Sequence, residues 1–579
     1  MESKYILYRI WIFIVIISLI LPILLQYTLH WRIVNEHNYS FSVYAVYLII
    51  YLFIQFVFAY LNNKGYQIIK SQSESQRESE SQGEIKLVNI IVVGYKENPE
   101  YYKKCLESIK ESYYKSENIN KIIVVIDGND EDDQYMVDIF NNIFTESSTN
   151  ILLADFDKND FIENHITDFE KNKLICISQN HDGKRTAMFT AFSISLFEKK
   201  RYNKNVEYVF CTDSDTIINP DCIENMITCF QKNKNIGSVC GNLSIFNKYE
   251  SFITFLSNLR YWHAFNLERA YQSFTGEVLC VSGPNGMYDI CVLEKIIEEW
   301  KNQTFLGKKC TYGDDRHLTN KILESSKKII YTPSSTAETE TPDNIYRFFK
   351  QQVRWNKSSF REFFWTLRII DKHSIFMTIN IIYMFIYPYL VMGYLLYILW
   401  FGNIFQLGFY STLLLGIGIV KSIYGYVLSK NPENLLYFLY GTVYVCIVFP
   451  AKLWSVINIK DNSWGTSSRK ILNKDFSIDI FAIIIWNTIL IAGLIKNIYG
   501  SLPLSTLSTL DGKVPLTNTT LDGKVPLTNT TLDGKVPLSF DNFYYFIISS
   551  FIWISFYTFT FIYIKYKKNK DAYIPLSIH

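Results

Sequence analysis

Apolar positions along this chain are gathered into long runs that contain no charged residue. One run, Ser374 to Val420, is long enough for two helices with a break near Gly402. Because roughly 20 apolar residues cross a bilayer as a helix, such runs predict transmembrane helices. A soluble protein with a large core would scatter Lys and Glu through every helix, so we expect an integral membrane protein in contact with the lipid bilayer. The runs lie at residues 10–29, 40–61, 374–420, 480–495 and 543–564.

Between the second and third runs lies a long segment with the pattern of a soluble α/β domain. Short β-branched runs at Leu87 to Tyr95, Lys121 to Ile126 and Val206 to Cys211 alternate with charged segments that look helical. This alternation predicts a largely parallel sheet, with a ligand site at the carboxyl ends of its strands. A polar low-complexity stretch, Ser71 to Gly83, precedes the domain and is expected to be a flexible tether.

Two segments of this domain, 251–274 and 344–370, mix Trp, Tyr and Phe with Arg and Lys. Helices of this composition can lie in the headgroup layer of a membrane, with their basic side chains reaching the water. We expect both to be interfacial, because the second leads directly into a membrane run. Two ordinary core helices are the alternative.

The distribution of lysines sets the expected topology. Several lysines follow the last apolar run, and the positive-inside rule therefore places that tail in the cytosol. An 11-residue unit, TLDGKVPLTNT, repeats within residues 501–541, where Asp-Gly and Pro predict turns in an external loop. Because the α/β domain and the loop 461–475 are both expected in the cytosol, the run at 435–452 should be interfacial or re-entrant. Both termini would then be cytosolic.

These patterns predict four regions. They are two N-terminal transmembrane helices within 1–65, a polar linker at 66–85, a cytosolic domain at 86–372 and a C-terminal membrane region at 373–579. Spans in the last region are expected near 374–401, 404–428, 480–499 and 543–564.

Composition narrows the function classes. Apolar residues make up 49% of the 579 residues and charged residues only 19%, which is high and low respectively for a soluble protein. The formal net charge of +2 gives no reason to expect a nucleic-acid partner. None of the ten cysteines forms a CxxC pair, which suits a reducing cytosolic domain without disulfides or structural zinc.

The strongest local motif is Asp213-Ser214-Asp215, which follows a hydrophobic strand. Alternate residues of an extended chain face the same side, so both carboxylates can point at one Mg²⁺ or Mn²⁺, which would neutralise a departing diphosphate. A solvated loop is the alternative for an isolated motif of this kind. Asp127 ends another strand and can hold a nucleoside, and Lys184 offers a positive charge to a phosphate. Together these residues favour a nucleotide site.

Two further motifs lie downstream. Asp314 and Asp315 are adjacent acids, and one of them can serve as the general base that transfer to a hydroxyl requires. The alternative is a helix N-terminus, where Asp side chains accept from free N–H groups. The second motif is Gln351-Gln352-Val353-Arg354-Trp355. Its indole can stack on the face of a sugar, and Arg354 can bind a pyrophosphate through two hydrogen bonds. The alternative is that Trp355 only packs at the membrane interface.

These residues, in this order, resemble those of the processive family-2 glycosyltransferases, which include hyaluronan, chitin and cellulose synthases. The resemblance spans Lys86 to about Arg469 and is strongest to the hyaluronan synthases. Chitin synthases usually have Glu-Asp-Arg where this chain has Asp-Asp-Arg at 314–316. The stretches that carry the resemblance to hyaluronan synthases are GYKE at 94–97, SGPNGMY at 282–288, CTYGDDRHLTN at 310–320, QQVRWNKSSFRE at 351–362 and SWGTSSRK at 463–470.

The resemblance implies a fold, a reaction and a set of site residues. The fold would be an α/β nucleotide-sugar-transferase domain of the A type, inserted among transmembrane helices of the plasma membrane. The reaction would be inverting transfer that alternates between UDP-N-acetylglucosamine and UDP-glucuronate and secretes the growing polysaccharide. Asp315 would be the base beside Asp314, and Asp213 and Asp215 would bind the metal. The nucleotide sugar would contact Tyr95, Glu97, Asp127, Lys184, Asp213, Arg354 and Trp464, and the acceptor Gln351, Trp355, Gly283 and Pro284.

One departure from the family is Asn285, where Leu is usual, and it bears on product length or acceptor preference because its loop is near the acceptor. Three other functions are weighed against hyaluronan synthesis. They are synthesis of chitin or a chito-oligosaccharide from UDP-N-acetylglucosamine alone, a transporter or channel with a nucleotide-binding domain, and non-processive transfer to a lipid. The few charged residues inside the apolar runs disfavour a transporter.

Overall fold

The computed structural model describes residues 50–66, 86–145, 148–152, 165, 169, 171–202, 205–461 and 479–500. The chain divides into two compact units, and the larger contains Tyr51–Leu390 and Leu414–Asn487. The predicted first N-terminal span, the repeat loop 501–541, the last span near 543–564 and Trp464 lie outside the described residues, as does almost all of the linker and of the loop 461–475.

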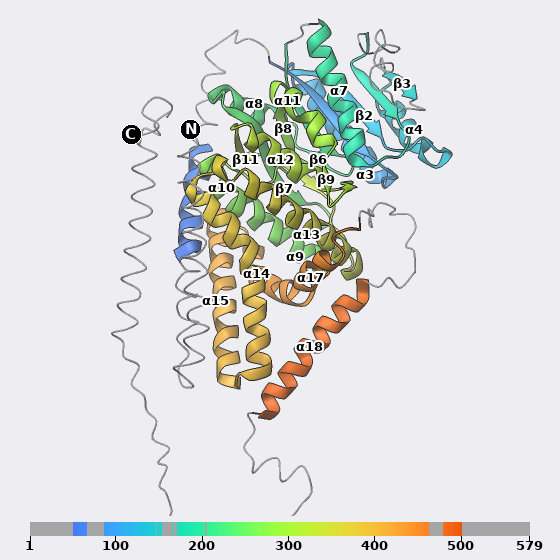
Figure 1. Cartoon of the computed structure of the whole chain (residues 1–579). Helices are drawn as coiled ribbons and strands as arrows, with labels where there is room; N and C mark the ends of the chain where they lie inside the picture. Colours follow the sequence, from blue (N-terminus) through green and yellow to red (C-terminus); the bar gives the residue numbers. More distant parts are fainter. Residues whose placement is uncertain are drawn as a thin grey trace, which may run out of the picture. The chain divides into compact units, whose positions relative to one another are not determined.

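A nine-stranded mixed sheet lies at the centre of the larger unit, with the strand order β3-β4-β2-β1-β5-β8-β7-β11-β6 (Figure 1). The five pairings β3–β4, β4–β2, β2–β1, β1–β5 and β7–β11 are parallel, which confirms the predicted largely parallel α/β sheet. The strands are β1 (Leu87–Gly94), β2 (Ile119–Ile126), β3 (Ser148–Leu152), β4 (Leu174–Ser178), β5 (Val206–Asp213), β6 (Ile217–Ile218), β7 (Ile236–Ile245), β8 (Gly286–Asp289) and β11 (Lys328–Thr339).

Strand β8 runs antiparallel to both of its neighbours, β5 and β7. Its first residue, Gly286, pairs with Cys211 near the carboxyl end of β5. The loop that precedes β8 therefore reaches the same edge of the sheet as the carboxyl ends of β1, β2 and β5. Strands β1 and β2 are almost continuous runs of buried Val and Ile, as expected for strands covered on both faces.

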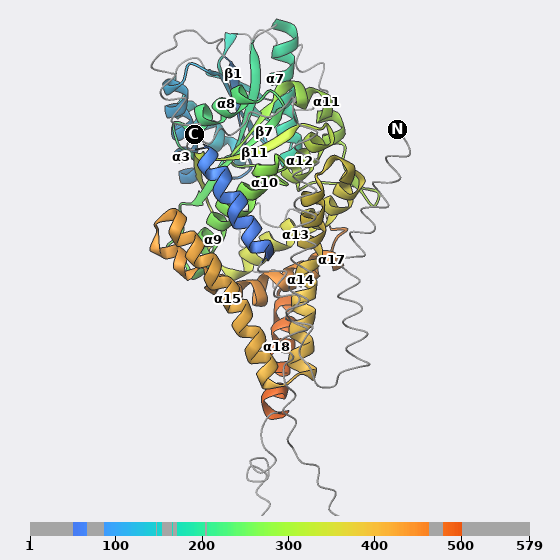
Figure 2. The ribbon, with the colours of Figure 1, turned by 90° about the vertical axis from the view of Figure 1, so that its left-hand side faces the viewer.

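Helices cover both faces of the sheet. Figure 2 shows α3 and α8 on one side of the strands and α7 and α11 on the other. Tyr208 of β5 stacks on Phe230 of α8, whereas Tyr288 of β8 meets Phe192 of α7 edge to face. The helices are α3 (Pro99–Lys115), α4 (Gln134–Ile143), α7 (Lys184–Tyr202), α8 (Cys222–Lys232), α11 (Ile290–Lys301), α12 (Asp314–Glu324) and α13 (Ile345–Arg368).

The two aromatic segments form helices that pack together. Residues 251–274 fall in α9 (Phe252–His263), a π-helical stretch η2 (Ala264–Arg269) and α10 (Ala270–Thr275), and most of the second segment is α13. Apolar side chains of α9 and α13 share a buried cluster with residues 437–451, so parts of both helices are core. Their predicted position at a membrane surface stays a prediction.

Among the residues that the structure describes, four helices are long and apolar enough to cross a membrane, which fits an integral membrane protein: Ile375–Phe401, Gln406–Ser429, Pro432–Ile457 and Asp479–Tyr499. They correspond to α14 (Ile375–Phe401), α15 (Ile404–Ser429), a composite helix and α18 (Asp479–Gly500). The composite helix contains the run at 435–452 and changes type along its length, from η4 (Pro432–Leu439) and α16 (Tyr440–Val443) to η5 (Tyr444–Val448) and α17 (Phe449–Ile457). Length and composition do not separate a span from the re-entrant segment predicted there.

Candidate active site

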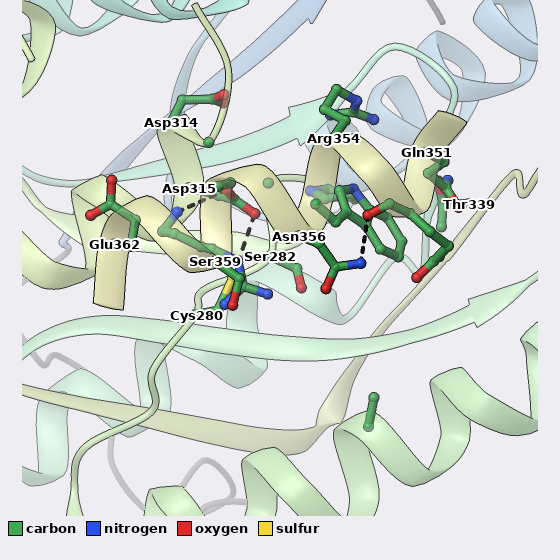
Figure 3. A pocket seen from close by; sticks show the side chains of 18 of the residues that line it. Cys280, Ser282, Asp314, Asp315, Thr339, Gln351, Arg354, Asn356, Ser359 and Glu362 are labelled. Atoms are coloured by element: carbon green, nitrogen blue, oxygen red, sulfur yellow. Dashed lines mark hydrogen bonds between the residues drawn. The ribbon is translucent and has the colours of Figure 1, made fainter. Parts of the chain in front are cut away.

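A cavity of about 910 Å³ lies in the larger unit, at the carboxyl edge of the sheet. Figure 3 shows part of its lining, which includes Asp314 and Asp315 of α12 and Gln351 and Arg354 of α13. The structure brings to this cavity every predicted site residue that it describes: Tyr95, Glu97, Asp127, Lys184, Asp213, Asp215, Gly283, Pro284, Asp314, Asp315, Gln351, Arg354 and Trp355.

The carboxylate of Asp127 sits at the end of β2 and is almost fully buried. It accepts hydrogen bonds from the backbone N–H groups of Asp182 at 3.2 Å and Gly183 at 2.9 Å, and from the amide of Gln179 at 3.0 Å. Burial raises the pKa of Asp127, and these hydrogen bonds oppose the rise. Asp127 thus fixes the loop that leads into Lys184.

Lys184 forms an ion pair with Asp213 at the end of β5. Burial alone would lower the pKa of Lys184, but the carboxylates of Asp213, Asp314 and Asp315 outweigh burial and raise it, so the ammonium stays charged. A Cβ atom on Gly283 would lie 3.1 Å from the Lys184 nitrogen and 3.6 Å from an oxygen of Asp213. The missing side chain at Gly283 leaves room for this pair.

The two carboxylates of the Asp-x-Asp motif both face the cavity, with Asp215 accepting from Thr216 at 3.3 Å and from Thr339 at 3.5 Å. No group of three or more His, Cys, Asp or Glu side chains among the described residues is arranged to hold a metal ion. Mg²⁺ is commonly bound by one or two carboxylates together with substrate phosphates and water. The all-oxygen pair Asp213 and Asp215 fits that kind of site.

Asp314 and Asp315 occupy the first turn of α12, after Gly313, whose φ of 80° suits glycine. The carboxylate of Asp315 accepts from the backbone N–H of Arg316 at 2.8 Å and from the thiol of Cys280 at 3.5 Å. The backbone carbonyl of Asp314 accepts from the indole of Trp300 at 2.9 Å. Both predicted features, a helix N-terminus and acids at the cavity wall, therefore occur together.

Helix α13 supplies the opposite side of the site. Gln351, Arg354 and Trp355 all line the cavity from this helix. The ring of Trp355 lies 6.4 Å, centroid to centroid, from that of Tyr261 in α9. An aromatic side chain, an amide and a guanidinium on one helix can present an apolar sugar face and hold polar groups around it.

Sequence reasoning missed residues that support this site. His181 stacks on Tyr95 at 4.1 Å and contacts Asp127 at 2.8 Å. Glu362 of α13 accepts hydrogen bonds from His317 at 3.1 Å and Asn320 at 2.9 Å, both on α12. Their only signal in the sequence is proximity to motifs, since His181 precedes Gly183-Lys184 and Glu362 ends the stretch that contains Trp355.

Asn285 has a structural role and is not among the residues that line the cavity. Its side chain is fully buried, and its amide donates to the carbonyls of Asn242 at 3.0 Å and Ser335 at 3.1 Å. It therefore ties the loop before β8 to β7 and β11. The neighbouring Pro284, not Asn285, lines the cavity.

Away from the carboxylates, the cavity wall becomes aromatic and apolar. Phe385 and Tyr389 of α14, Tyr440 of α16, and Tyr444 and Val448 of η5 line this end. All of them belong to helices that are apolar enough to cross a membrane. One cavity thus joins the acidic site to the membrane helices of the larger unit.

The α/β sheet with its acidic carboxyl edge, joined to apolar helices, is the arrangement expected of a membrane glycosyltransferase. Comparisons with known proteins narrow the class. A family model described as chitin synthase matches residues 199–476. Hyaluronan synthase 2 of Homo sapiens is 35% identical over 500 residues, which cover 83% of this chain and 87% of that protein. Hyaluronan synthase 3 of Xenopus laevis is 35% identical over 472 residues, which cover 80% of this chain and 81% of that protein. The chain belongs to the hyaluronan synthase family of glycosyltransferases, and the family predicted from its motifs is confirmed.

Among solved structures, a mannosyltransferase from Pyrobaculum calidifontis, in complex with GDP-mannose and Mn²⁺, matches 71% of this chain and 99% of that chain. The sequence identity is 15% and the TM-score is 0.37. A similarity at this level carries no argument about the ligands of this chain.

Proposed function

We propose that this protein polymerises N-acetylglucosamine and glucuronate, taken alternately from their UDP derivatives, into hyaluronan, and passes the polymer across the plasma membrane. The observation that carries this proposal is a single cavity lined by Asp315, by Asp213 and Asp215, by Trp355 and by helices apolar enough to cross a membrane. The family relatives support an enzyme of this activity. The catalytic domain and both termini would be cytosolic.

Transfer would be a single inverting displacement. The acceptor hydroxyl attacks the anomeric carbon of the donor sugar, the bond from that carbon to the diphosphate breaks, and UDP leaves. Asp315 takes the proton of the hydroxyl, with Asp314 beside it at the start of α12. Trp355 and Gln351 hold the acceptor sugar, and Gly283 and Pro284 border it.

The donor would be held by Tyr95, Glu97, Asp127 and Lys184 on the sheet side and by Arg354 from α13, with Trp464 closing over the diphosphate. Asp213 and Asp215 would hold Mg²⁺ or Mn²⁺, which neutralises charge on the departing diphosphate. Lys184, already paired with Asp213, adds a second positive charge next to the same phosphates.

The test is synthesis by membranes that contain the full-length protein, supplied with each UDP-sugar separately and with both together. We expect polymer only with both sugars, and we expect a hyaluronan-specific lyase to degrade all of it. A lyase-resistant polymer made from UDP-N-acetylglucosamine alone would instead establish the alternative, a chitin or chito-oligosaccharide synthase, which the chitin synthase family match keeps in view.

A further inference from the structure

The composite helix that borders the cavity changes its winding where its side chains meet the cavity. Four of its cavity-lining residues lie at steps of four: Tyr440, Tyr444, Val448 and Lys452. Four residues turn an α-helix by about 400°, so three such steps would drift by about 120° from the starting face. The π-helical stretch η5 lies inside this row, and its wider turn takes back part of the drift. The π-helical turn thus helps to keep the row on the cavity side.

This π-helical turn ends at a proline. The backbone N–H of Phe449 donates to the carbonyl of Tyr444, five residues earlier. Pro450 has no N–H, so it offers no donor to Val445, five residues earlier, or to Cys446, four residues earlier. A backbone carbonyl without a donor is costly in apolar surroundings. The helix itself therefore leaves at least one of these two carbonyls short of a donor.

Helix α18 supplies the missing donors. The indole N–H of Trp486 donates to the carbonyl of Val445 at 2.9 Å. The side-chain amide of Asn487 donates to the carbonyl of Cys446 at 3.0 Å and to that of Ile483 in its own helix at 2.8 Å, which uses both amide hydrogens. Trp486 is buried, and neither Trp486 nor Asn487 is among the residues that line the cavity.

We infer that Trp486 and Asn487 are positioning residues, which hold the π-helical turn and with it the rings of Tyr440 and Tyr444 in the cavity wall. The inference rests on the proposed function, since it concerns the polymer of that reaction. In that function the growing chain passes this wall, where aromatic rings hold the apolar faces of its sugars. Without the two donors the turn loses its support, the rings lose their fixed position, and the chain is released after fewer additions.

The experiment compares polymer length in membranes that contain the full-length protein and both UDP-sugars. Trp486→Phe keeps an aromatic ring and removes the indole N–H. We expect the mean polymer length to fall by about tenfold, equal to about 1.4 kcal/mol of hold on the chain, with the KM for UDP-sugars unchanged. Asn487→Leu removes the second donor and should shorten the polymer in the same way.

The matched control is Trp454→Phe. It also removes an indole N–H between the composite helix and α18, the one that donates to Asp479 at 2.6 Å, but this contact lies outside the π-helical turn. The polymer made by Trp454→Phe should therefore keep its length.

A second substitution separates this role from general damage to the fold. Pro450→Ala provides the backbone N–H that the proline lacks. In the π register the new N–H donates to Val445, and in the α register Phe449 donates to Val445 instead. The carbonyl of Val445 then has a donor in either register. Added to Pro450→Ala, Trp486→Phe should thus shorten the polymer by less than about twofold.

Several results would overturn the inference. They are a polymer of unaltered length from Trp486→Phe, equal shortening by Trp486→Phe with and without Pro450→Ala, equal shortening by Trp454→Phe, and a raised KM for UDP-sugars as the only defect. A polymer made by the unaltered protein from UDP-N-acetylglucosamine alone would defeat the proposed function itself. Hyaluronan of unaltered length from Trp486→Phe would defeat only this inference.

Discussion

The buried contact between α12 and α13 predicts a strong effect of Glu362, a residue with no assigned role in the proposed reaction. Glu362 of α13 accepts from His317 and Asn320 of α12, and from Gln303 at 2.6 Å. Its side chain is 5% exposed. Burial alone would raise the pKa of Glu362, but the hydrogen bonds, first that of His317, outweigh burial and lower it, so the carboxylate is charged. Glu362 therefore joins the helix of the proposed base to the helix of Trp355.

Glu362→Leu would leave three buried donors without an acceptor. Each unsatisfied donor costs roughly 1–3 kcal/mol, and loss of one partner of a buried charged network typically costs about 3–5 kcal/mol in total. With roughly 2–4 °C for each kcal/mol in a domain of this size, we expect the Tm to fall by about 10 °C. Glu362→Gln should lower the Tm less. The side-chain oxygen of Gln303 has no hydrogen-bond partner among the described residues, so it can accept a hydrogen bond from the new amide once the amide of Gln303 has rotated.

Thermal unfolding of the solubilised protein and UDP release at saturating substrate would check both effects. A shift of about 1 Å between the base and Trp355 is expected to lower kcat by up to about a hundredfold, with the KM for UDP-sugars little changed. Glu324→Leu is the matched control on α12, because Glu324 is 39% exposed and its partner Lys321 keeps a second ion pair, with Glu299 at 2.5 Å. If Glu362→Leu melts within about 2 °C of the unaltered protein and keeps its kcat, then Glu362 does not hold α12 and α13 together as proposed.

Three more changes test other parts of the site. Asp315→Asn should still bind UDP, as measured by calorimetry, but should release no UDP from UDP-sugars above background. Polymer output equal to that of the unaltered protein would refute the assigned base. Gly283→Ala should raise the KM for UDP-sugars several-fold, because its Cβ would lie 3.1 Å from the Lys184 nitrogen, and an unchanged KM would show that the loop yields freely. Burial lowers the folded-state pKa of His317. As the pH drops below about 6.5, the usual pKa of a histidine in an unfolded chain, the unfolded state therefore binds a proton more readily than the folded state. The Tm should then fall with decreasing pH, and it should fall less steeply in His317→Asn. Equal slopes of Tm against pH in the two proteins would contradict this explanation.

Local pattern predicts much of the α/β domain. The predicted β-branched runs Leu87 to Tyr95, Lys121 to Ile126 and Val206 to Cys211 fall in β1, β2 and β5, which pair in parallel as their alternation with helices indicates. Because parallel strands end at the same edge, carboxylates placed directly after them meet without any knowledge of long-range contacts. This reasoning accounts for the sheet side of the cavity.

Contacts between distant segments could not be predicted in the same way. Nothing in the periodicity of α12 or α13 indicates that His317 donates to Glu362, because either side chain would fit an exposed helix face equally well. Asn285 presents the same difficulty: its loop borders the cavity, but its side chain turns to the core, where strand carbonyls accept from it. Burial of a polar residue depends on partners that only the folded chain supplies.

The reversed direction of β8 has a consequence for how this enzyme can diverge. If β8 were parallel to its neighbours, the loop before it would lie at the far edge of the sheet, where insertions and substitutions would be silent. Because β8 is antiparallel, that loop lines the cavity, and a residue added there changes the shape of the proposed active site directly. Variation among descendants of this gene should therefore be tolerated after β8 and selected before it.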